Sequence, residues 1–239
     1  MLRTIKNNIP NAITSVNLVS GMLAIVAAFH SREILLWGLP GYQVAYLCIA
    51  LGAVADFLDG LVARLLHSVS GIGKELDSLS DLVTFGIAPA MIVYNLLAVG
   101  HDPEYPVLGL LALLLGLAGA LRLARFNVDP NQATTFTGLP IPANAIFWIG
   151  ASQWLADHPS MHIGVVLAGV VLFSWLMVCN LRMFSLKVHS YHPRDSWAQY
   201  LLLTFGLVSL LTIGLCSLAA TIGLYVIMSL FTVGKKTEQ

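Results

Sequence analysis

Charged residues are scarce in this sequence. Lysine, arginine, aspartate and glutamate together make up 10% of the 239 residues, against about 25% in soluble domains. Twelve basic and twelve acidic side chains balance each other, and no basic stripe offers a surface for nucleic acid. Apolar residues make up 57% of the chain and raise its mean hydropathy to +0.82. This composition excludes a soluble domain of any size and indicates an integral membrane protein.

Cysteine is also rare. Cys48, Cys179 and Cys216 lie far apart inside apolar runs, and no pair has the C-x-x-C spacing. Disulfide frameworks and thiolate zinc sites both need cysteines in recognisable groups. The three cysteines are therefore expected to serve as packing residues.

Eight apolar runs have the length that a membrane-spanning helix requires, about 20 residues. They are residues 12–30, 42–66, 77–99, 106–125, 140–156, 162–180, 198–214 and 216–233. The last two form one uncharged stretch, which is either two spans joined by a tight turn near Ile213 to Cys216 or one long span with a re-entrant piece. We expect an all-α fold, a polytopic membrane helix bundle with about eight transmembrane helices.

The positions of lysine and arginine predict the orientation, because the cytoplasmic side of a membrane protein collects them. With eight spans and a cytoplasmic N-terminus, eleven of the twelve basic residues fall on the inner side and only Arg32 falls outside. Both termini are then cytoplasmic, and the protein is expected in a bacterial cytoplasmic membrane. Residues 1–11 are expected to form an amphipathic segment on its inner surface, with a cleaved signal peptide as the alternative.

One stretch, DFLDGLVARLLHSVSGIGKELDSLSD at residues 56–81, concentrates charge. Asp56 and Asp59 are three residues apart at the end of the second span, and Asp77 and Asp81 are four apart at the start of the third. Residues at these spacings share a helix face, so two adjacent antiparallel helices would bring four carboxylates together. Because unpaired carboxylates in a membrane are costly, we expect two divalent cations, Mg²⁺ or Mn²⁺, among these oxygen ligands.

Small residues and an arginine accompany the aspartates. Gly60 and Gly73 leave room for a bulky ligand, and the fixed charge of Arg64 suits phosphate. Each feature alone has an ordinary explanation, since paired aspartates often mark a solvated membrane boundary and Asp-Gly is a common turn signal. Their combination at fixed offsets favours a site that processes phosphate.

The whole pattern reads D-x2-D-G-x2-A-R-x8-G-x3-D-x3-D and comprises Asp56, Asp59, Gly60, Ala63, Arg64, Gly73, Asp77 and Asp81. It resembles the signature of the CDP-alcohol phosphotransferase family without a departure. The resemblance implies that the four aspartates bind two divalent metals and that Asp81 is also the catalytic base. It further implies that Gly60, Ala63 and Gly73 line the cytidine pocket, with Arg64 near the phosphates.

Further stretches are similar to the phosphatidylserine synthase branch of this family: residues 9–25, 76–90, 121–128 and 136–145, and less closely 180–187. The resemblance implies transfer of a phosphatidyl group from CDP-diacylglycerol, a membrane lipid, to L-serine, with release of CMP. It places a six-helix catalytic domain at residues 12–187 and two additional helices at residues 188–239. The alternatives are glycerol phosphate or inositol as acceptor, or a cation transporter, although no internal repeat supports a transporter.

Polar residues at the predicted inner ends of two spans are candidates to bind the acceptor or a phosphate: Arg122, Arg125, Asn127, Arg182, Ser185 and Lys187. An arginine can bind a carboxylate at two points, although the positive-inside pattern alone also explains arginines here. The polar face of Asn11, Thr14 and Asn17 in the first span either lines the nucleotide pocket or bonds neighbouring helices. The sequence is also compatible with a homodimer.

Overall fold

The structure is a computed structural model that describes residues 2–68, 71–100, 106–128, 137–181, 183 and 197–234. Its elements in chain order are α1 (Leu2–Phe29), β1 (Ile34–Leu36), β2 (Leu39–Pro40), α2 (Gly41–Leu65), α3 (Gly71–Asp81), the π-helix η1 (Leu82–Ile87), α4 (Ala88–Gly100), α5 (Pro106–Gly109), η2 (Leu110–Ala112), α6 (Leu113–Val128), α7 (Ile141–Asp157), α8 (Ile163–Val178), α9 (Trp197–Ile213), η4 (Gly214–Cys216) and α10 (Ser217–Gly234). The two short strands form an antiparallel pair between α1 and α2.

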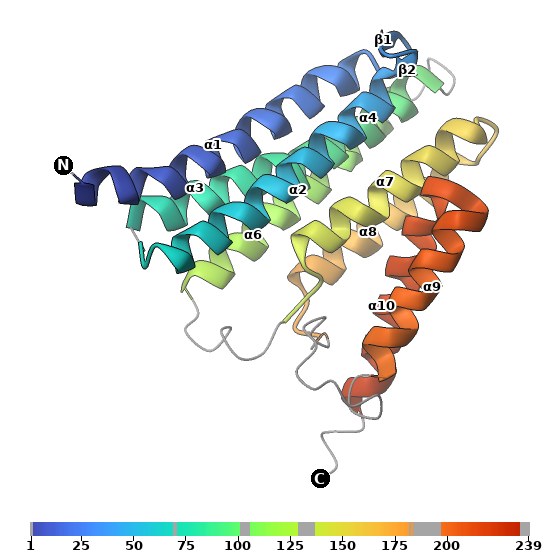
Figure 1. Ribbon diagram of the computed structural model, residues 1–239. Helices are drawn as coiled ribbons and strands as arrows, with labels where there is room; N and C mark the ends of the chain where they lie inside the picture. Colours follow the sequence, from blue (N-terminus) through green and yellow to red (C-terminus); the bar gives the residue numbers. More distant parts are fainter. Residues whose placement is uncertain are drawn as a thin grey trace.

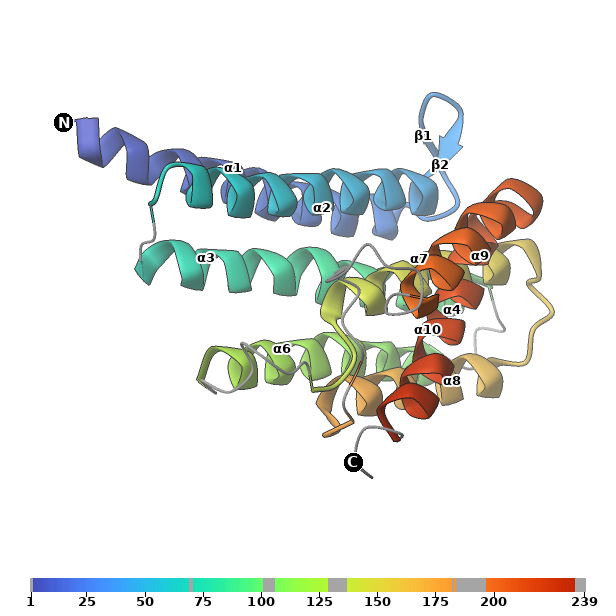
Figure 2. The ribbon, with the colours of Figure 1, turned by 60° about the horizontal axis from the view of Figure 1, so that its bottom comes forward.

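The helices form an elongated bundle (Figure 1). In Figure 2, α1 and α2 lie above α3, and α6 and α8 lie below it. The N-terminal end of α1, the C-terminal end of α2, the start of α3 and the C-terminal end of α6 all lie at the same end of the bundle (Figures 1 and 2). We call this the site end, because it carries the acidic stretch.

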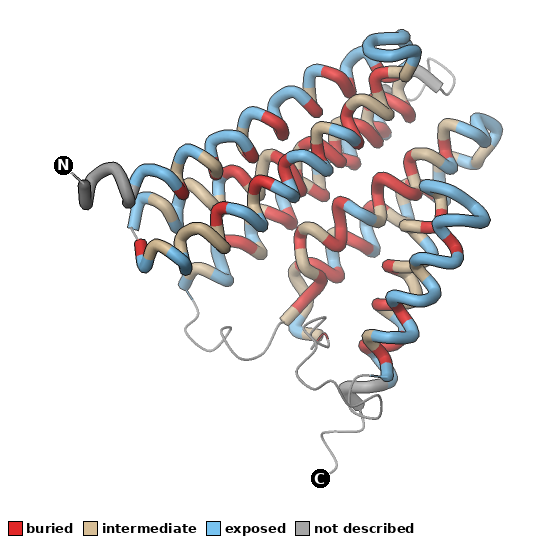
Figure 3. Tube along the Cα trace, viewed as in Figure 1, coloured by how far each residue is buried: buried red, intermediate tan, exposed pale blue. Residues whose placement is uncertain are grey.

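Apolar side chains cover the outside of the bundle as well as its core. Figure 3 shows that most helices turn buried residues inward and exposed residues outward, and the exposed set is rich in leucine, valine, isoleucine and phenylalanine. Five helical segments are long and apolar enough to cross a membrane: Asn8–Phe29, Gly41–Leu65, Gly71–Ala98, Val107–Val128 and Trp197–Phe231. The expected architecture, a polytopic membrane helix bundle, is confirmed.

Each of the eight predicted ranges contains helix, although their lengths differ. α7 and α8 have 17 and 16 residues, which is less than about 20 for a span without tilt or thinning. The expected turn near Ile213 to Cys216 is present: Gly214 has a φ of 67°, and α9 and α10 pack against each other on either side of it (Figure 1). The number of helices that cross the membrane stays a prediction.

The N-terminal residues are continuous with the first span. α1 runs from Leu2 to Phe29 with Pro10 inside it, so the predicted amphipathic segment forms the first turns of this helix. Its position relative to the membrane surface stays a prediction.

Glycines allow α1 and α2 to approach the π-helix closely. Thr84 of η1 is fully buried, and its Oγ1 donates a hydrogen bond of 3.0 Å to the carbonyl oxygen of Asn17. A Cβ on Gly21 of α1 would lie 2.9 Å from the backbone nitrogen and Cα of Thr84, and one on Gly52 of α2 would lie 2.6 Å from its Cγ2. Backbone atoms cannot rotate away, so the contact at Gly21 fixes the distance between α1 and η1.

Gly21→Ala is therefore expected to destabilise the protein by about 1–3 kcal/mol, the usual cost of overpacking a tight core. The melting temperature of the purified protein in detergent should fall by several degrees. Gly223→Ala is the matched control, because no heavy atom outside its own helix turn lies within 4 Å of a Cβ there. Equal melting temperatures for the two variants would contradict the close packing at Gly21.

Candidate active site

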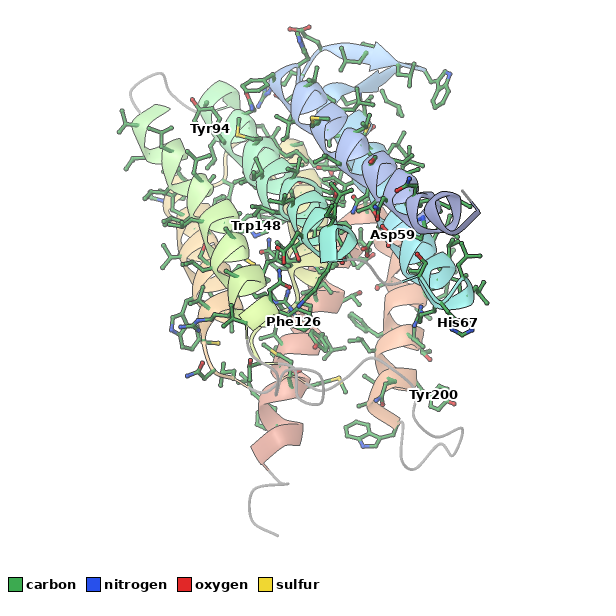
Figure 4. The ribbon with its side chains drawn as sticks, turned by 90° about the vertical axis from the view of Figure 1, so that its left-hand side faces the viewer. Asp59, His67, Tyr94, Phe126, Trp148 and Tyr200 are labelled. Atoms are coloured by element: carbon green, nitrogen blue, oxygen red, sulfur yellow. The ribbon has the colours of Figure 1, made fainter. Side chains whose placement is uncertain are left out.

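The four aspartates of the acidic stretch come from two helices that meet at the site end. Asp56 and Asp59 lie near the C-terminal end of α2, and Asp77 and Asp81 lie in the last turns of α3. One carboxylate oxygen from each of Asp56, Asp59 and Asp77 lies within 4.8 Å of the other two. Figure 4 views the bundle from this end and shows Asp59 among the ends of α1, α2 and α3. We call these three residues the carboxylate group.

Asp81 lies one helical turn beyond Asp77 and next to the carboxylate group. Its side chain interacts electrostatically with those of Asp56, Asp77 and Asp59. Asn17 of α1 donates a hydrogen bond of 3.3 Å from Nδ2 to Asp81 Oδ1. A donor on one oxygen fixes the orientation of the carboxyl, so α1 holds Asp81 relative to the other three aspartates.

The π-helix η1 begins directly after Asp81. Short π-helical segments interrupt α-helices frequently at functional sites. Asn17 of α1 contacts both Asp81 and the π-helix. Its side chain donates a hydrogen bond to Asp81, and its backbone carbonyl accepts one from Thr84 of η1. Asn17 is fully buried, so this connection is part of the core as well as of the site.

The carboxylate group contains buried oxygens without hydrogen bonds. Asp59 is only 6% exposed, and neither its Oδ2 nor Asp77 Oδ1 has a hydrogen-bond partner among the described residues. The salt bridge found within the described ranges, between His30 and Glu33, involves neither residue. A buried, unpaired carboxylate is costly unless a cation balances it. Carboxylate oxygens are the ligands that hard divalent cations prefer, so these residues fit such an ion.

A pocket of about 170 Å³ opens beside the carboxylate group. Three helices and the segment after α2 line it: Asp59, Gly60 and Ala63 of α2, Gly73, Lys74 and Asp77 of α3, Pro10, Asn11 and Thr14 of α1, and Ser68. A Cβ on Gly60 would meet no heavy atom within 4 Å, so this glycine leaves open space rather than close packing. The three small residues that the sequence assigned to one pocket therefore do line a common pocket, next to two of the aspartates.

Arg64 is not among the residues that line this pocket. Its side chain is exposed, and Nε donates a hydrogen bond of 2.9 Å to the carbonyl oxygen of Gly60, one turn earlier in α2. Its predicted place near a phosphate stays a prediction.

The three polar candidates on α6 have different surroundings. Arg122 lines a second cavity and not the pocket beside the carboxylate group, and its buried Nε has no hydrogen-bond partner in the described part of the chain. Arg125 Nη1 donates a hydrogen bond of 2.6 Å to the carbonyl oxygen of Val178 at the end of α8. Asn127 Nδ2 donates to Ser78 Oγ of α3 at 2.9 Å. Arg125 and Asn127 thus connect helices, whereas Arg122 leaves a buried donor unused.

A cavity of about 580 Å³ extends from Arg122 and Arg125 to the C-terminal end of α8, where Met177, Cys179 and Asn180 line it. The remaining predicted acceptor residues, Arg182, Ser185 and Lys187, lie outside the described residues.

Three residues of the first pocket were not predicted: Pro10, Ser68 and Lys74. Lys74 and Ser68 line it beside Gly73, and Lys74 Nζ also donates to the carbonyl oxygen of Asn127 at 3.4 Å. The basic charge directly after Gly73 was the available signal for Lys74. Asn11 and Thr14, whose role the sequence left open, also line the pocket, and Asn17 binds Asp81 instead.

Comparison with known protein families gives a match that covers the candidate site. The family model of the CDP-alcohol phosphatidyltransferases matches residues 7–181, a range that contains the carboxylate group, Asp81 and the pocket. It does not include α9 and α10.

Named relatives come from distant organisms. The chain is 36% identical over 192 residues to the CDP-diacylglycerol--serine O-phosphatidyltransferase of Bacillus subtilis, covering 80% of this chain and 97% of the relative. It is 36% identical to the Methanocaldococcus jannaschii protein of the same name, over 70% of this chain and 71% of that protein. It is 42% identical to the Saccharomyces cerevisiae protein of that name over 58% of this chain and 51% of that protein. With its aspartates and small residues gathered at one site inside the matched range, the chain belongs to the CDP-alcohol phosphatidyltransferase family.

Proposed function

We propose that the protein transfers the phosphatidyl group of CDP-diacylglycerol to the hydroxyl of L-serine, giving phosphatidylserine and CMP. The names of its bacterial, archaeal and yeast relatives support serine as the acceptor. The observation that carries the proposal is the convergence of Asp56, Asp59 and Asp77 beside a pocket of small residues at one end of an apolar bundle. There the acyl chains can stay in lipid while the nucleotide and serine arrive from water.

Divalent cations complete this site. Asp56, Asp59, Asp77 and Asp81 would hold two of them, and the four negative charges of the carboxylates balance their four positive charges. When bound, such ions neutralise charge on the phosphate oxygens, which is the main requirement of phosphoryl transfer. The unpaired buried oxygens of Asp59 and Asp77 support this assignment.

Asp81 is the proposed base. As the serine oxygen forms its bond to the phosphorus of the phosphatidyl group, Asp81 accepts the hydroxyl proton. The bond between that phosphorus and the oxygen of CMP breaks, and CMP leaves with the electron pair. Asn17 holds the Asp81 carboxyl in one orientation, so the proton acceptor is in place before serine binds.

The remaining signature residues bind the nucleotide. Gly60, Ala63 and Gly73 present little side-chain bulk to the pocket, which allows a flat base or ribose to approach the backbone. Lys74 lines the same pocket, and Arg64 one turn from Gly60 adds a second positive charge for phosphate. Arg122, which lines the cavity shared with Arg125, is the candidate to bind the serine carboxylate.

The orientation follows from the distribution of charge. We place eight spans in the membrane with both termini and the site end in the cytoplasm, because eleven of the twelve basic residues then lie inside. The segment 12–187 forms the catalytic domain under this proposal, and residues 188–239 add the α9 and α10 pair.

A panel of acceptor alcohols tests the proposed function. Purified protein is incubated with CDP-diacylglycerol, Mn²⁺ or Mg²⁺, and serine, glycerol 3-phosphate or inositol, and both CMP and the lipid product are measured. Serine should give phosphatidylserine with one CMP per lipid. A product formed from another alcohol and not from serine would keep the family and overturn the acceptor.

A further inference from the structure

Lys74 is the basic residue of the pocket beside the carboxylate group. Asp59 and Asp77 line the same pocket, whose volume is about 170 Å³, and among the described residues around it Lys74 is the only one with a positive charge. Arg64 does not line the pocket and binds the carbonyl oxygen of Gly60 instead. A phosphate bound in this small pocket beside the two aspartates is therefore close to the lysine.

The C-terminal end of α6 holds the ammonium group of Lys74. Its Nζ donates a hydrogen bond of 3.4 Å to the carbonyl oxygen of Asn127, which lies in the last turn of α6. The last carbonyls of a helix have no partner within that helix and attract cations. Asn127 Nδ2 also donates a hydrogen bond of 2.9 Å to the Oγ of Ser78, one turn after Lys74 in α3. Two contacts between α3 and α6 thus determine where the lysine lies.

The ammonium group of Lys74 has donors to spare. A lysine carries three N–H donors, and Asn127 takes one of them. The salt bridge found in the described part of the chain joins other residues, although Asp77 follows Lys74 by three residues and shares its face of α3. Lys74 is exposed, so its hydrogen bond to Asn127 orients the side chain and contributes little to stability. The remaining donors are available to an anion in the pocket.

We propose that Lys74 binds the phosphate of the cytidylate group and stabilises the negative charge that CMP takes up as it leaves. This role rests on the proposed function, which supplies CDP-diacylglycerol as the substrate. As the serine oxygen bonds to the phosphorus of the phosphatidyl group, the bond from that phosphorus to the oxygen of CMP breaks. The electron pair goes to CMP, and the proton of serine goes to Asp81. The CMP phosphate therefore gains negative charge during the reaction, and a cation already in place beside it lowers the barrier.

Binding of CMP and of cytidine tests this contact without turnover. Each ligand is titrated into the full chain in detergent with Mn²⁺ present, by isothermal titration calorimetry. Lys74→Gln should raise the Kd for CMP about tenfold or more, as expected for losing a charged hydrogen bond to phosphate. The Kd for cytidine, which has no phosphate, should stay unchanged, and Lys74→Arg should recover most of the affinity for CMP. Glu75→Gln is the matched control, because this neighbour on α3 is exposed and does not line the pocket. It should bind both ligands like the wild type.

Turnover gives the second measurement. Lys74→Gln should lower kcat about ten- to hundredfold and leave the KM for serine unchanged, because the lysine contacts the leaving group and not the acceptor. An unchanged Kd for CMP in Lys74→Gln would overturn the proposal. Equal losses of affinity for CMP and cytidine would also overturn it, and would leave Lys74 as a structural contact between α3 and α6. A wild-type chain that binds CMP through Lys74 but transfers the phosphatidyl group to another alcohol would overturn only serine as the acceptor.

Discussion

Asp81→Asn is expected to lower the rate of phosphatidyl transfer by about 10²–10⁴-fold, the range for losing a general base. Asparagine has nearly the same shape as aspartate but cannot accept a proton from serine. The substitution also removes one negative charge from beside the carboxylate group, with which Asp81 interacts electrostatically. Both losses act on the same reaction, so this single-atom change should lower the rate strongly.

The rate should be measured as CMP released at saturating serine and CDP-diacylglycerol. Asp157→Asn is the matched control, because Asp157 ends α7 away from the carboxylate group and contacts Gln153 and Cys216 there. Its rate should be close to that of the wild-type chain. An Asp81→Asn variant that melts normally and retains more than a tenth of the activity would exclude Asp81 as the base.

Removal of divalent cations is expected to abolish the reaction altogether. Without them the four neighbouring carboxylates would repel the phosphates of CDP-diacylglycerol, and no charge would balance the phosphate oxygens during transfer. Treatment with a chelator should reduce CMP release to background, and Mg²⁺ or Mn²⁺ added afterwards should restore it. The measurement is the initial rate as a function of free metal concentration.

Substitution of a single proposed metal ligand tests whether these aspartates hold the cations. Asp59→Asn should raise the metal concentration for half-maximal activity at least about tenfold, since even the loss of a residue that only orients a metal ligand commonly costs 10–100-fold in affinity. Glu75→Gln is the control: this acidic residue is exposed on α3, and the sequence places it two residues before Asp77. Full activity in the presence of chelator, or equal metal requirements in the two variants, would contradict the metal assignment.

The helical elements of the fold followed from the sequence because apolar runs of about 20 residues have few alternatives in a membrane. The turn between α9 and α10 was one of two possibilities, and Gly214, with its positive φ, provides it. The π-helix at residues 82–87 could not be predicted, because its apolar sequence is also compatible with α-helix. Its contacts with Gly21 and Gly52 depend on how the helices are rotated against each other, and the hydropathy pattern gives no information about that rotation.

The candidate site was predictable where spacing within one helix determines it. Asp56 with Asp59, and Asp77 with Asp81, share helix faces by their offsets alone, and the structure brings Asp56, Asp59 and Asp77 together. The partners from other helices were harder to predict. Asn17 and Arg122 stood among several polar residues of equal standing, because their surroundings depend on how the helices pack.

Metal binding by the purified full chain tests directly whether the four aspartates hold two divalent cations. Mn²⁺ can be titrated into the protein in detergent, and the free ion followed by electron paramagnetic resonance. We expect two bound Mn²⁺ ions per chain in the wild type, loss of that binding in an Asp56→Asn, Asp59→Asn double variant, and normal binding in Glu75→Gln. Absence of binding in the wild type, or equal binding in the double variant, would contradict it.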